Sequence, residues 1–212
     1  MTGKLITLEG GEGAGKSTVL DTVRAALVAH GVEVVVTREP GGTPAGEAIR
    51  AVLLDPRLRG MSAETELLLM FAARAQLVRE VIRPALAAGR WVLSDRFTDA
   101  SYAYQGGGRG QPATRIAALE AWAADGVRPD LTLLLDLPVV EGLRRANGRG
   151  EADRIEMENA QFFERVRDAY RARAAAEPGR FRVIDAGRPL AEVLAQVQGA
   201  IAEFLARGGV PA

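Results

Sequence analysis

Residues 5–18 read LITLEGGEGAGKST, a short apolar run followed by a glycine-rich loop. Within them, Gly10-x-x-x-x-Gly15-Lys16-Ser17 matches the Walker A pattern, and the segment that follows has apolar residues at helical spacing. In such a loop, glycines let backbone N–H groups converge on phosphate oxygens, the lysine reaches the β- and γ-phosphates, and the serine hydroxyl ligates Mg²⁺. Lysine occurs only at positions 4 and 16, so a chance match is rare. The stretch predicts a strand, a phosphate-binding loop and a helix that together hold ATP and Mg²⁺.

Glu12 is the unusual residue of this loop, because it places a carboxylate where anions are expected to bind. Two like charges about 4 Å apart repel by roughly 4 kcal/mol at an effective dielectric constant of about 20. Either Glu12 points away from the phosphates, or the loop binds something else. The residues expected to contact ATP are Gly10, Gly11, Glu12, Gly13, Ala14, Gly15, Lys16, Ser17 and Thr18.

The rest of the chain alternates short apolar runs with helical patterns. These runs lie at residues 5–9, 32–37, 91–95, 131–137 and 181–185. They are rich in Val, Ile and Leu without polar alternation, which is typical of parallel strands covered by helices on both faces. We expect one α/β domain over residues 1–212, with a five-stranded parallel sheet and a long helix at 64–88. The polar, glycine-marked stretch at about 147–156 is expected to be a mobile lid.

Composition excludes several classes of function. Basic and acidic residues both number 27, so no overall field would recruit a nucleic acid polymer or a membrane surface. Cysteine is absent, which excludes disulfides and thiolate metal sites and agrees with a cytoplasmic location, as does the lack of a signal-peptide pattern. The single histidine argues against histidine-based chemistry. A GTPase is excluded because no lysine is left for an Asn-Lys-x-Asp element.

A second group of polar residues follows later strands. Arg38 in TREPGGT and Arg96 in SDRF would emerge on the same edge of the sheet as the phosphate loop, where doubly wound folds bind ligands. Together they suggest a forked clamp for a second phosphate. Further candidates are the aromatic and polar side chains of MFAAR and SYAYQGGGRG, namely Phe71, Arg74, Ser101, Tyr104 and Gln105. A kinase with a phosphorylated acceptor is therefore favoured.

These motifs, taken in order, resemble a known family. The stretches LEGGEGAGKST, TREPGGT, MFAARAQLV, SDRF…AYQGGGRG and RGEADRIE resemble those of bacterial thymidylate kinases, from residue 8 to about residue 156, and IDAGRPL at 184–190 extends the likeness. The resemblance implies a P-loop nucleoside monophosphate kinase core. It also implies a homodimer that transfers the γ-phosphate of ATP to dTMP.

The family pattern implies roles for residues on the acceptor side. Arg38 and Arg96 would clamp the dTMP phosphate, and Asp95 would support Mg²⁺ together with Ser17. For the nucleoside, the implied contacts are Phe71 stacked on thymine, Arg74 at its 4-carbonyl, Ser101 and Gln105 lining the base pocket, and Tyr104 crowding the 2′ position.

The resemblance also implies roles for the lid and for Glu12. The phosphate loop has no arginine, so Arg149 or Arg154 of the lid would lie over the transferring phosphoryl group. Glu12 would bind the 3′-hydroxyl of the acceptor, turned away from ATP. No general base is needed, because a phosphate monoester has a second pKa of about 6 and is a competent nucleophile at neutral pH.

Two other functions remain open on the sequence. A deoxynucleoside kinase would need a carboxylate base beside its hydroxyl acceptor, but no arginine clamp. A non-catalytic, ATP-dependent regulatory module would bind ATP without acceptor-dependent release of ADP. Activity against thymidine and dTMP separates these functions from a dTMP kinase.

Overall fold

The computed structural model describes residues 3–146 and 152–208. Its centre is a five-stranded parallel sheet in the order β2-β3-β1-β4-β5. The strands are β1 (Leu5–Gly10), β2 (Val34–Arg38), β3 (Trp91–Asp95), β4 (Leu131–Asp136) and β5 (Phe181–Asp185). The predicted five-stranded parallel α/β fold is therefore confirmed.

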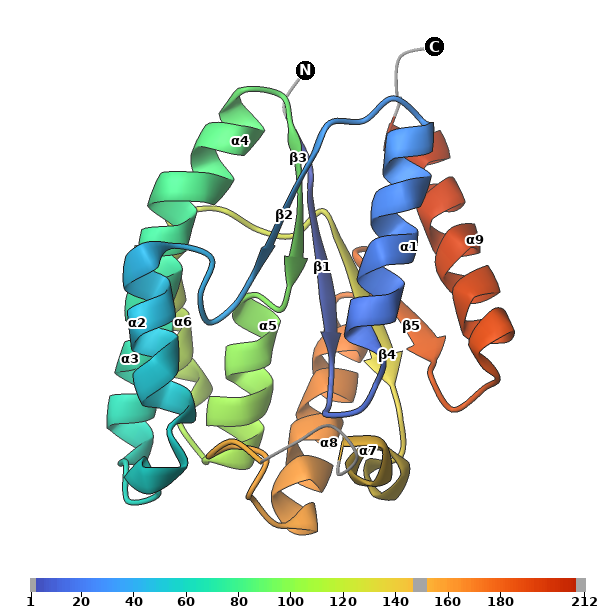
Figure 1. The fold of residues 1–212 in the computed structure, drawn as a ribbon. Coiled ribbons are helices and arrows are strands. Elements are labelled where there is room, and N and C mark those ends of the chain that lie inside the picture. Colours follow the sequence, from blue (N-terminus) through green and yellow to red (C-terminus); the bar gives the residue numbers. More distant parts are fainter. Residues whose placement is uncertain (1–2, 147–151, 209–212) are drawn as a thin grey trace.

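Helices cover both faces of the sheet (Figure 1). They are α1 (Lys16–Ala29), α2 (Pro44–Leu54), α3 (Ala63–Leu77), α4 (Arg83–Ala87), α5 (Thr98–Ser101), α6 (Ala113–Ala123), α7 (Val139–Ala146), α8 (Ala160–Ala176) and α9 (Leu190–Gly208). The long helix expected at 64–88 is one continuous helical run, widened between α3 and α4 by a π-helical turn, η2 (Val78–Ile82). A second π-helical segment, η3 (Tyr102–Gly108), continues α5, and a short 3₁₀ turn, η1 (Pro56–Leu58), follows α2.

Alternate residues of each strand serve different layers of the core. Ile6 and Leu8 of β1 pack in one apolar cluster with residues of α1 and α9, the two helices that lie side by side in Figure 1. Leu5 belongs to another cluster, which contains residues of α3, η2 and α4. Because successive strand residues point to opposite faces, burial of both faces explains the apolar runs of the central strands β1 and β4, whereas Val36 of β2 and Val183 of β5 are exposed at the two edges.

The parallel sheet brings chemistry-bearing residues to one edge. Arg38 at the end of β2 is in register with Asp95 at the end of β3, and Leu8 of β1 is also in register with Asp95. The arrowheads of β1, β3 and β4 in Figure 1 point to this edge, where the phosphate loop, α7 and α8 lie. Among the described residues, no helix has the length and apolar character needed to cross a membrane.

Candidate active site

The phosphate loop connects β1 to α1. Gly13 and Gly15 have φ angles of 70° and 88°, in the left-handed region that glycine adopts at low cost. Lys16, the first residue of α1, folds back so that its Nζ donates hydrogen bonds to the carbonyls of Gly10 (3.2 Å) and Gly11 (3.1 Å). Desolvation lowers the pKa of Lys16, and the charge of Arg96 acts in the same direction. The ammonium group is thus held inside the loop, at the place where phosphate oxygens would gather.

Close packing excludes a side chain at position 13. A Cβ built on Gly13 would lie 2.1 Å from the carbonyl oxygen of Gly142 in α7. In the same contact, a Cβ on Gly142 would lie 2.4 Å from the carbonyl oxygen of Glu12. The loop therefore cannot carry an arginine at position 13. Any guanidinium that reaches the transferring group must come from another segment.

Glu12 faces Arg96, the residue after β3, and η3. Its Oε1 accepts hydrogen bonds from Arg96 Nη2 (2.9 Å) and from Tyr104 Oη (2.8 Å). These contacts answer the electrostatic question raised by the sequence, because the Glu12 carboxylate is neutralised locally by the guanidinium of Arg96.

Arg96 is the centre of the polar contacts at this end of the site. Its backbone is in the left-handed region, with φ of 71°. Nη1 donates to the Gly10 carbonyl and to Tyr170 Oη (both 3.0 Å), while Nη2 donates to Glu12 and to Tyr104 Oη (2.8 Å). Both terminal nitrogens thus have protein partners. A dTMP phosphate would have to displace some of them or bind through Nε.

Beneath Arg96, a buried carboxyl group fixes the strand ends. Glu9 Oε1 accepts from the backbone N–H of Phe97 (2.8 Å), and Oε2 accepts from Tyr170 Oη (2.7 Å). Burial raises the pKa of Glu9 to about 8, and the charge of Asp99 adds to the shift. Tyr170 of α8 therefore links Glu9 to Arg96. The sequence did not reveal this role, because Tyr170 follows Phe163 and Val166 at helical spacing and reads as a core residue.

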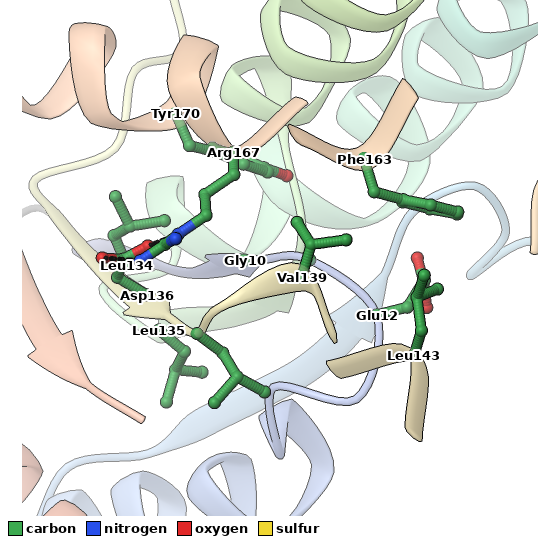
Figure 2. A pocket seen from close by; sticks show the side chains of 12 residues that line it. Gly10, Glu12, Leu134, Leu135, Asp136, Val139, Leu143, Phe163, Arg167 and Tyr170 are labelled. Carbon is green, nitrogen blue, oxygen red and sulfur yellow. Dashed lines mark hydrogen bonds and ion pairs between the residues drawn. The ribbon is translucent and has the colours of Figure 1, made fainter. Parts of the chain in front are cut away.

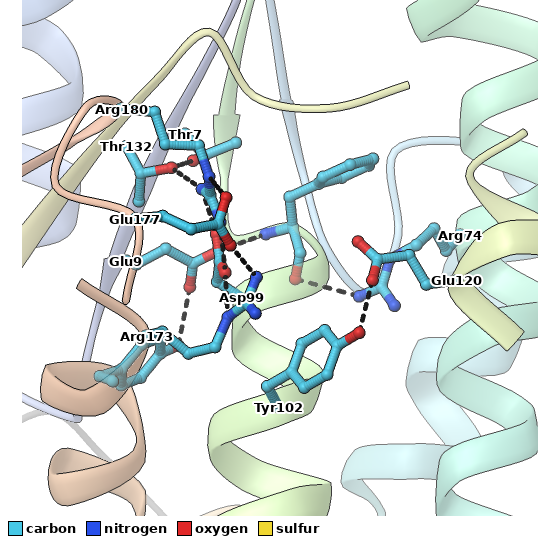
Figure 3. A network of polar contacts seen from close by, with 12 residues as sticks. Thr7, Glu9, Arg74, Asp99, Tyr102, Glu120, Thr132, Arg173, Glu177 and Arg180 are labelled. Carbon is cyan, nitrogen blue, oxygen red and sulfur yellow. Dashed lines mark hydrogen bonds and ion pairs between the residues drawn. The ribbon is translucent and has the colours of Figure 1, made fainter. Parts of the chain in front are cut away.

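A network behind the site holds η3 and its neighbours in place (Figure 3). Asp99 of α5 accepts hydrogen bonds from Arg173 Nε of α8 (2.9 Å) and from Arg180 Nη1 (2.7 Å). Arg180 also donates to Thr132 Oγ1 of β4 (2.8 Å). These contacts join α5, α8 and β4 behind the segment that carries Tyr104 and Gln105.

A cavity of about 330 Å³ opens beside the phosphate loop. Arg38 and Arg50 line it, and Arg38 Nη2 donates to Glu47 (3.0 Å) on an exposed surface. Arg50 of α2 was not predicted, since the chain has only two lysines among 27 basic residues and a single arginine gives no signal. The other residues that line the cavity are Glu12, Gly13, Ala14, Gly15, Lys16, Ser17, Glu39, Pro40, Leu54, Met70, Asp95, Arg96, Ala100, Tyr104, Gln105, Asp153, Ile155 and Glu156.

Three of the predicted base-binding residues lie together behind the wall of this cavity. The Arg74 guanidinium lies 4.5 Å from the centre of the Phe71 ring, and Arg74 Nη1 donates to Ser101 Oγ (3.0 Å). Nε and Nη2 of Arg74 donate to Glu39 Oε2, at 2.8 and 2.6 Å. Phe71, Arg74 and Ser101 are buried and are not among the residues that line the cavity. Their contact with a base stays a prediction.

Arg154 differs from the expectation that it lies over the transferring phosphoryl group. It is buried, and its Nη2 donates to Glu66 Oε2 of α3 (2.6 Å) while Nε donates to the Leu53 carbonyl (2.7 Å). The physical reason is the buried carboxylate of Glu66, which needs charged partners. Arg149 lies outside the described residues, as does part of the expected lid.

Asp95 and Ser17 fit a magnesium site. Asp95 Oδ1 is buried without a hydrogen-bond partner among the described residues, and both side chains line the cavity beside the loop. Mg²⁺ typically uses one or two protein ligands and takes the rest from phosphates and water. The absence, within residues 3–146 and 152–208, of a group of three acidic, histidine or cysteine side chains therefore does not argue against it.

Two of the other cavities lie against the loop. One of about 160 Å³ lies on the α1 side, lined by Ala14, Gly15, Thr18, Val19, Arg145, Ala186, Arg188, Leu190 and Val193. The other, of only about 20 Å³, lies behind Gly10 and Glu12, where Val139, Leu143 and Phe163 approach the loop (Figure 2). There Arg167 Nε donates to Asp136 Oδ1 (2.7 Å). This space is too small for a nucleotide.

Comparisons with known proteins agree with this geometry. The family model described as thymidylate kinase matches residues 8–197. The chain belongs to the thymidylate kinase family. It is 60% identical over 205 residues to the thymidylate kinase of Pseudomonas syringae pv. tomato, covering 97% of this chain and 98% of that one. It is 55% identical over 211 residues to the enzyme of Halorhodospira halophila, covering 99% and 98% of the two chains.

A solved structure supports the same assignment. The crystal structure of thymidylate kinase from Ehrlichia chaffeensis matches with a TM-score of 0.75 and 30% identity, and covers 97% of this chain and 99% of that chain. The resemblance stated from the motifs is thus confirmed for the thymidylate kinase family. Family membership also decides against the deoxynucleoside kinase and the non-catalytic regulatory module.

Proposed function

We propose how this member of the thymidylate kinase family, which uses ATP to phosphorylate dTMP to dTDP, divides that reaction among its residues. The observation that carries the proposal is the position of Glu12. It lies in the ATP-binding loop, yet it accepts hydrogen bonds from Arg96 and Tyr104 of the neighbouring cavity. We infer that ATP occupies the loop side of this point and dTMP the cavity side.

On the ATP side, the backbone N–H groups of residues 10–18 bind the phosphates. Lys16 exchanges the carbonyls of Gly10 and Gly11 for β- and γ-phosphate oxygens, which are stronger, charged acceptors. Ser17 and Asp95 would hold Mg²⁺, which would supply charge neutralisation at the phosphates. The cavity of about 160 Å³ that Arg145 and Arg188 line takes the adenosine.

On the acceptor side, three arginines bind the dTMP phosphate. Arg38, Arg50 and Arg96 all line the cavity beside the loop. Glu12 accepts a hydrogen bond from the 3′-hydroxyl, and Tyr104 lies against the 2′ position, which disfavours ribose. The attacking phosphate oxygen needs no general base, so positioning and charge neutralisation carry the catalysis.

The base lies at the far end of the same cavity. Phe71 stacks on thymine, and Arg74, whose guanidinium lies 4.5 Å from the centre of the Phe71 ring, donates to the 4-carbonyl. Ser101 and Gln105 complete the pocket. Because Phe71 and Arg74 are buried, this step requires a small opening of the cavity wall around Met70 and Ala100.

The lid supplies the remaining positive charge. No side chain fits at position 13 of the loop, and Arg154 is held by Glu66. Of the two lid arginines, we therefore assign the transition-state role to Arg149 and a positioning role to Arg154.

We also propose a homodimer and a cytoplasmic location. Large apolar side chains are exposed on helices that pack side by side, with 82% of Trp122 on α6 and 58% of Leu68 on α3 accessible. Light scattering is expected to give twice the chain mass for the parent protein and a lower mass for Trp122→Glu. A monomeric parent protein would contradict the dimer. The cytoplasmic location rests on the absence of cysteine in the sequence.

Acceptor-dependent ADP release tests the function. ATP with Mg²⁺ would be assayed against dTMP, dUMP, UMP, dCMP and thymidine. We expect dTMP to be the best acceptor and thymidine to be inert. Preference for thymidine would instead support a deoxynucleoside kinase, and ATP binding without acceptor-dependent ADP release would support a regulatory module.

A further inference from the structure

Glu66 is a buried carboxylate that none of the proposed steps uses. It lies on α3 and is 1% exposed, among three side chains that donate to it: Gln105, Arg109 and Arg154. We call these four residues the Glu66 cluster. Gln105 is the member that also lines the cavity proposed for dTMP.

The cluster keeps Glu66 ionised. Oε2 accepts from Arg154 Nη2 (2.6 Å) and from Arg109 Nε (3.1 Å), and Oε1 accepts from Gln105 Nε2 (2.9 Å). Burial by itself raises the pKa of Glu66, but the hydrogen bond from Gln105 and the contacts with both arginines outweigh it and lower the pKa. An ionised carboxylate can only accept hydrogen bonds.

This charge state fixes which way the Gln105 amide points. An amide can be turned over so that its oxygen and nitrogen exchange places. With Glu66 ionised, the reversed orientation would bring two acceptor oxygens together. Gln105 must therefore present Nε2 to Glu66 and direct Oε1 elsewhere. That oxygen has no hydrogen-bond partner among the described residues, and the residue is only 1% exposed, so water does not readily replace the missing partner.

An unpaired, fixed acceptor in the wall of a nucleotide cavity selects for a donor on the ligand. A buried acceptor without a partner is costly, so a base that supplies a donor is favoured over one that does not. Thymine carries a hydrogen on N3, whereas N3 of cytosine is an acceptor. The same cavity has Arg74, a donor, directly behind its wall, which suits a carbonyl at position 4 better than an amino group.

We propose that Glu66 is a positioning residue for base selectivity, which orients Gln105 so that its Oε1 accepts the N3–H of thymine and rejects cytosine. The inference rests on the proposed use of the cavity by dTMP. It assigns to Glu66 a role that needs no contact with the substrate.

The first test compares Glu66→Gln with Glu64→Gln. The substitution at Glu66 provides an amide that can donate or accept, so Gln105 can turn over and present Nε2 to the base. We expect the ratio of kcat/KM for dTMP to that for dCMP to fall by about tenfold or more, the factor that one lost buried hydrogen bond represents. Glu64 is an exposed carboxylate on the same helix, and its substitution removes the same charge. It should leave the ratio unchanged.

The second test leaves the carboxylate and its arginine partners in place. Gln105→Ala would be assayed with dTMP and with N3-methyl-dTMP, which lacks the N3 hydrogen. The parent protein should use the methylated nucleotide about tenfold or more worse than dTMP. In Gln105→Ala, no hydrogen-bond acceptor is left unpaired at this position, and there is room for the methyl group. The kcat/KM values for dTMP and N3-methyl-dTMP should therefore differ by no more than about twofold. If Glu66→Gln fails to fold, this test can still contradict the inference, because it measures the contact that Glu66 is proposed to set.

The outcomes separate this inference from the proposed function. If the parent protein phosphorylates dTMP, but Glu66→Gln keeps the parental ratio of dTMP to dCMP, the inference is wrong and the function stands. Equal discrimination against N3-methyl-dTMP by Gln105→Ala and the parent protein would likewise overturn it. If the parent protein does not phosphorylate dTMP, the proposed function itself fails.

Discussion

Glu12 and Glu66 are carboxylates of similar chemistry in opposite situations. Glu12 accepts hydrogen bonds from Arg96 and from Tyr104 of η3. Glu66 accepts them from Arg109, from Arg154 and from Gln105, the next residue of η3. The Glu12 side chain is 20% exposed and lines the cavity, whereas that of Glu66 is 1% exposed and lies behind it. A carboxylate at the surface of a cavity can exchange partners with a ligand. A buried one with charged partners fixes its neighbours.

The comparison extends to the two ends of the site. At the end proposed for the phosphates, Lys16 and Arg96 are held by loop carbonyls and by Glu12, which are partners that phosphates can replace. At the end proposed for the base, Arg74 and Arg154 form ion pairs of 2.6 Å with buried carboxylates, and these pairs would be costly to break. We therefore expect substitutions at the phosphate end to change turnover, and those at the base end to change selectivity or stability.

The largest expected effect separates the two lid arginines. Arg149→Ala should lower kcat by something like the roughly 10³ to 10⁵ attributed to arginine fingers, with the KM for dTMP little changed. Arg154→Ala breaks the pair with Glu66 and should lower kcat far less, while reducing the free energy of unfolding by about 3 kcal/mol or more. Steady-state kinetics and urea unfolding of both variants measure this difference. Equal losses of kcat would show that Arg154 leaves Glu66 during turnover.

The next effect concerns Lys16. Lys16→Ala removes the one lysine of the loop, and kcat should fall by about 10² to 10³ or more, as when a preorganised donor to the transition state is lost. Circular dichroism should show an intact fold. Turnover at the parental level in a folded variant would contradict the assignment of the phosphate loop.

A smaller effect is expected at Glu12. Glu12→Gln replaces a charged acceptor of the 3′-hydroxyl with a neutral one, and a hydrogen bond to a charged group is worth roughly 1.5 to 3 kcal/mol. The KM for dTMP should therefore rise by about tenfold or more, with a smaller loss in kcat and little change in the KM for ATP. If ATP and dTMP are weakened equally, Glu12 serves the structure of the loop instead.

The smallest effect is a pH dependence of stability from Glu9. Burial raises its pKa from 4.5 to about 8, so between these pH values the folded protein keeps a proton that the unfolded chain releases. The stabilisation is fully present below about pH 4.5 and is lost as the pH rises through about 8. Glu9→Gln cannot ionise, so its free energy of unfolding should decrease less between pH 5 and pH 8 than that of the parent protein. Equal decreases in urea titrations would contradict the role of Glu9.

The phosphate loop and the sheet could be predicted because their signals are local. The Walker A pattern and the five short apolar runs each depend on a few consecutive residues. Central parallel strands, buried on both faces, are typically apolar along most of their length. The resemblance to the family predicted the residues that would bind dTMP. These residues come from separate segments that only the fold brings together.

The partners of these residues could not be predicted. The pairs of Arg154 with Glu66, Arg74 with Glu39 and Tyr170 with Glu9 join positions 88, 35 and 161 residues apart. No spacing rule connects such positions, and arginine is too frequent in this chain for any single one to give a signal. Burial decides these pairs, because a carboxylate without water must find a donor within the fold.

The difference between the two carboxylates is tested most directly with 3′-deoxy-dTMP. We would measure kcat/KM for this nucleotide and for dTMP in the parent protein, Glu12→Gln and Glu66→Gln. We expect loss of the 3′-hydroxyl to lower kcat/KM by a similar factor, about tenfold or more, in the parent protein and in Glu66→Gln, because both retain Glu12. We expect a much smaller factor for Glu12→Gln, in which the charged hydrogen bond is already missing. A loss in Glu12→Gln as large as that in the parent protein would contradict the role of Glu12 at the 3′-hydroxyl.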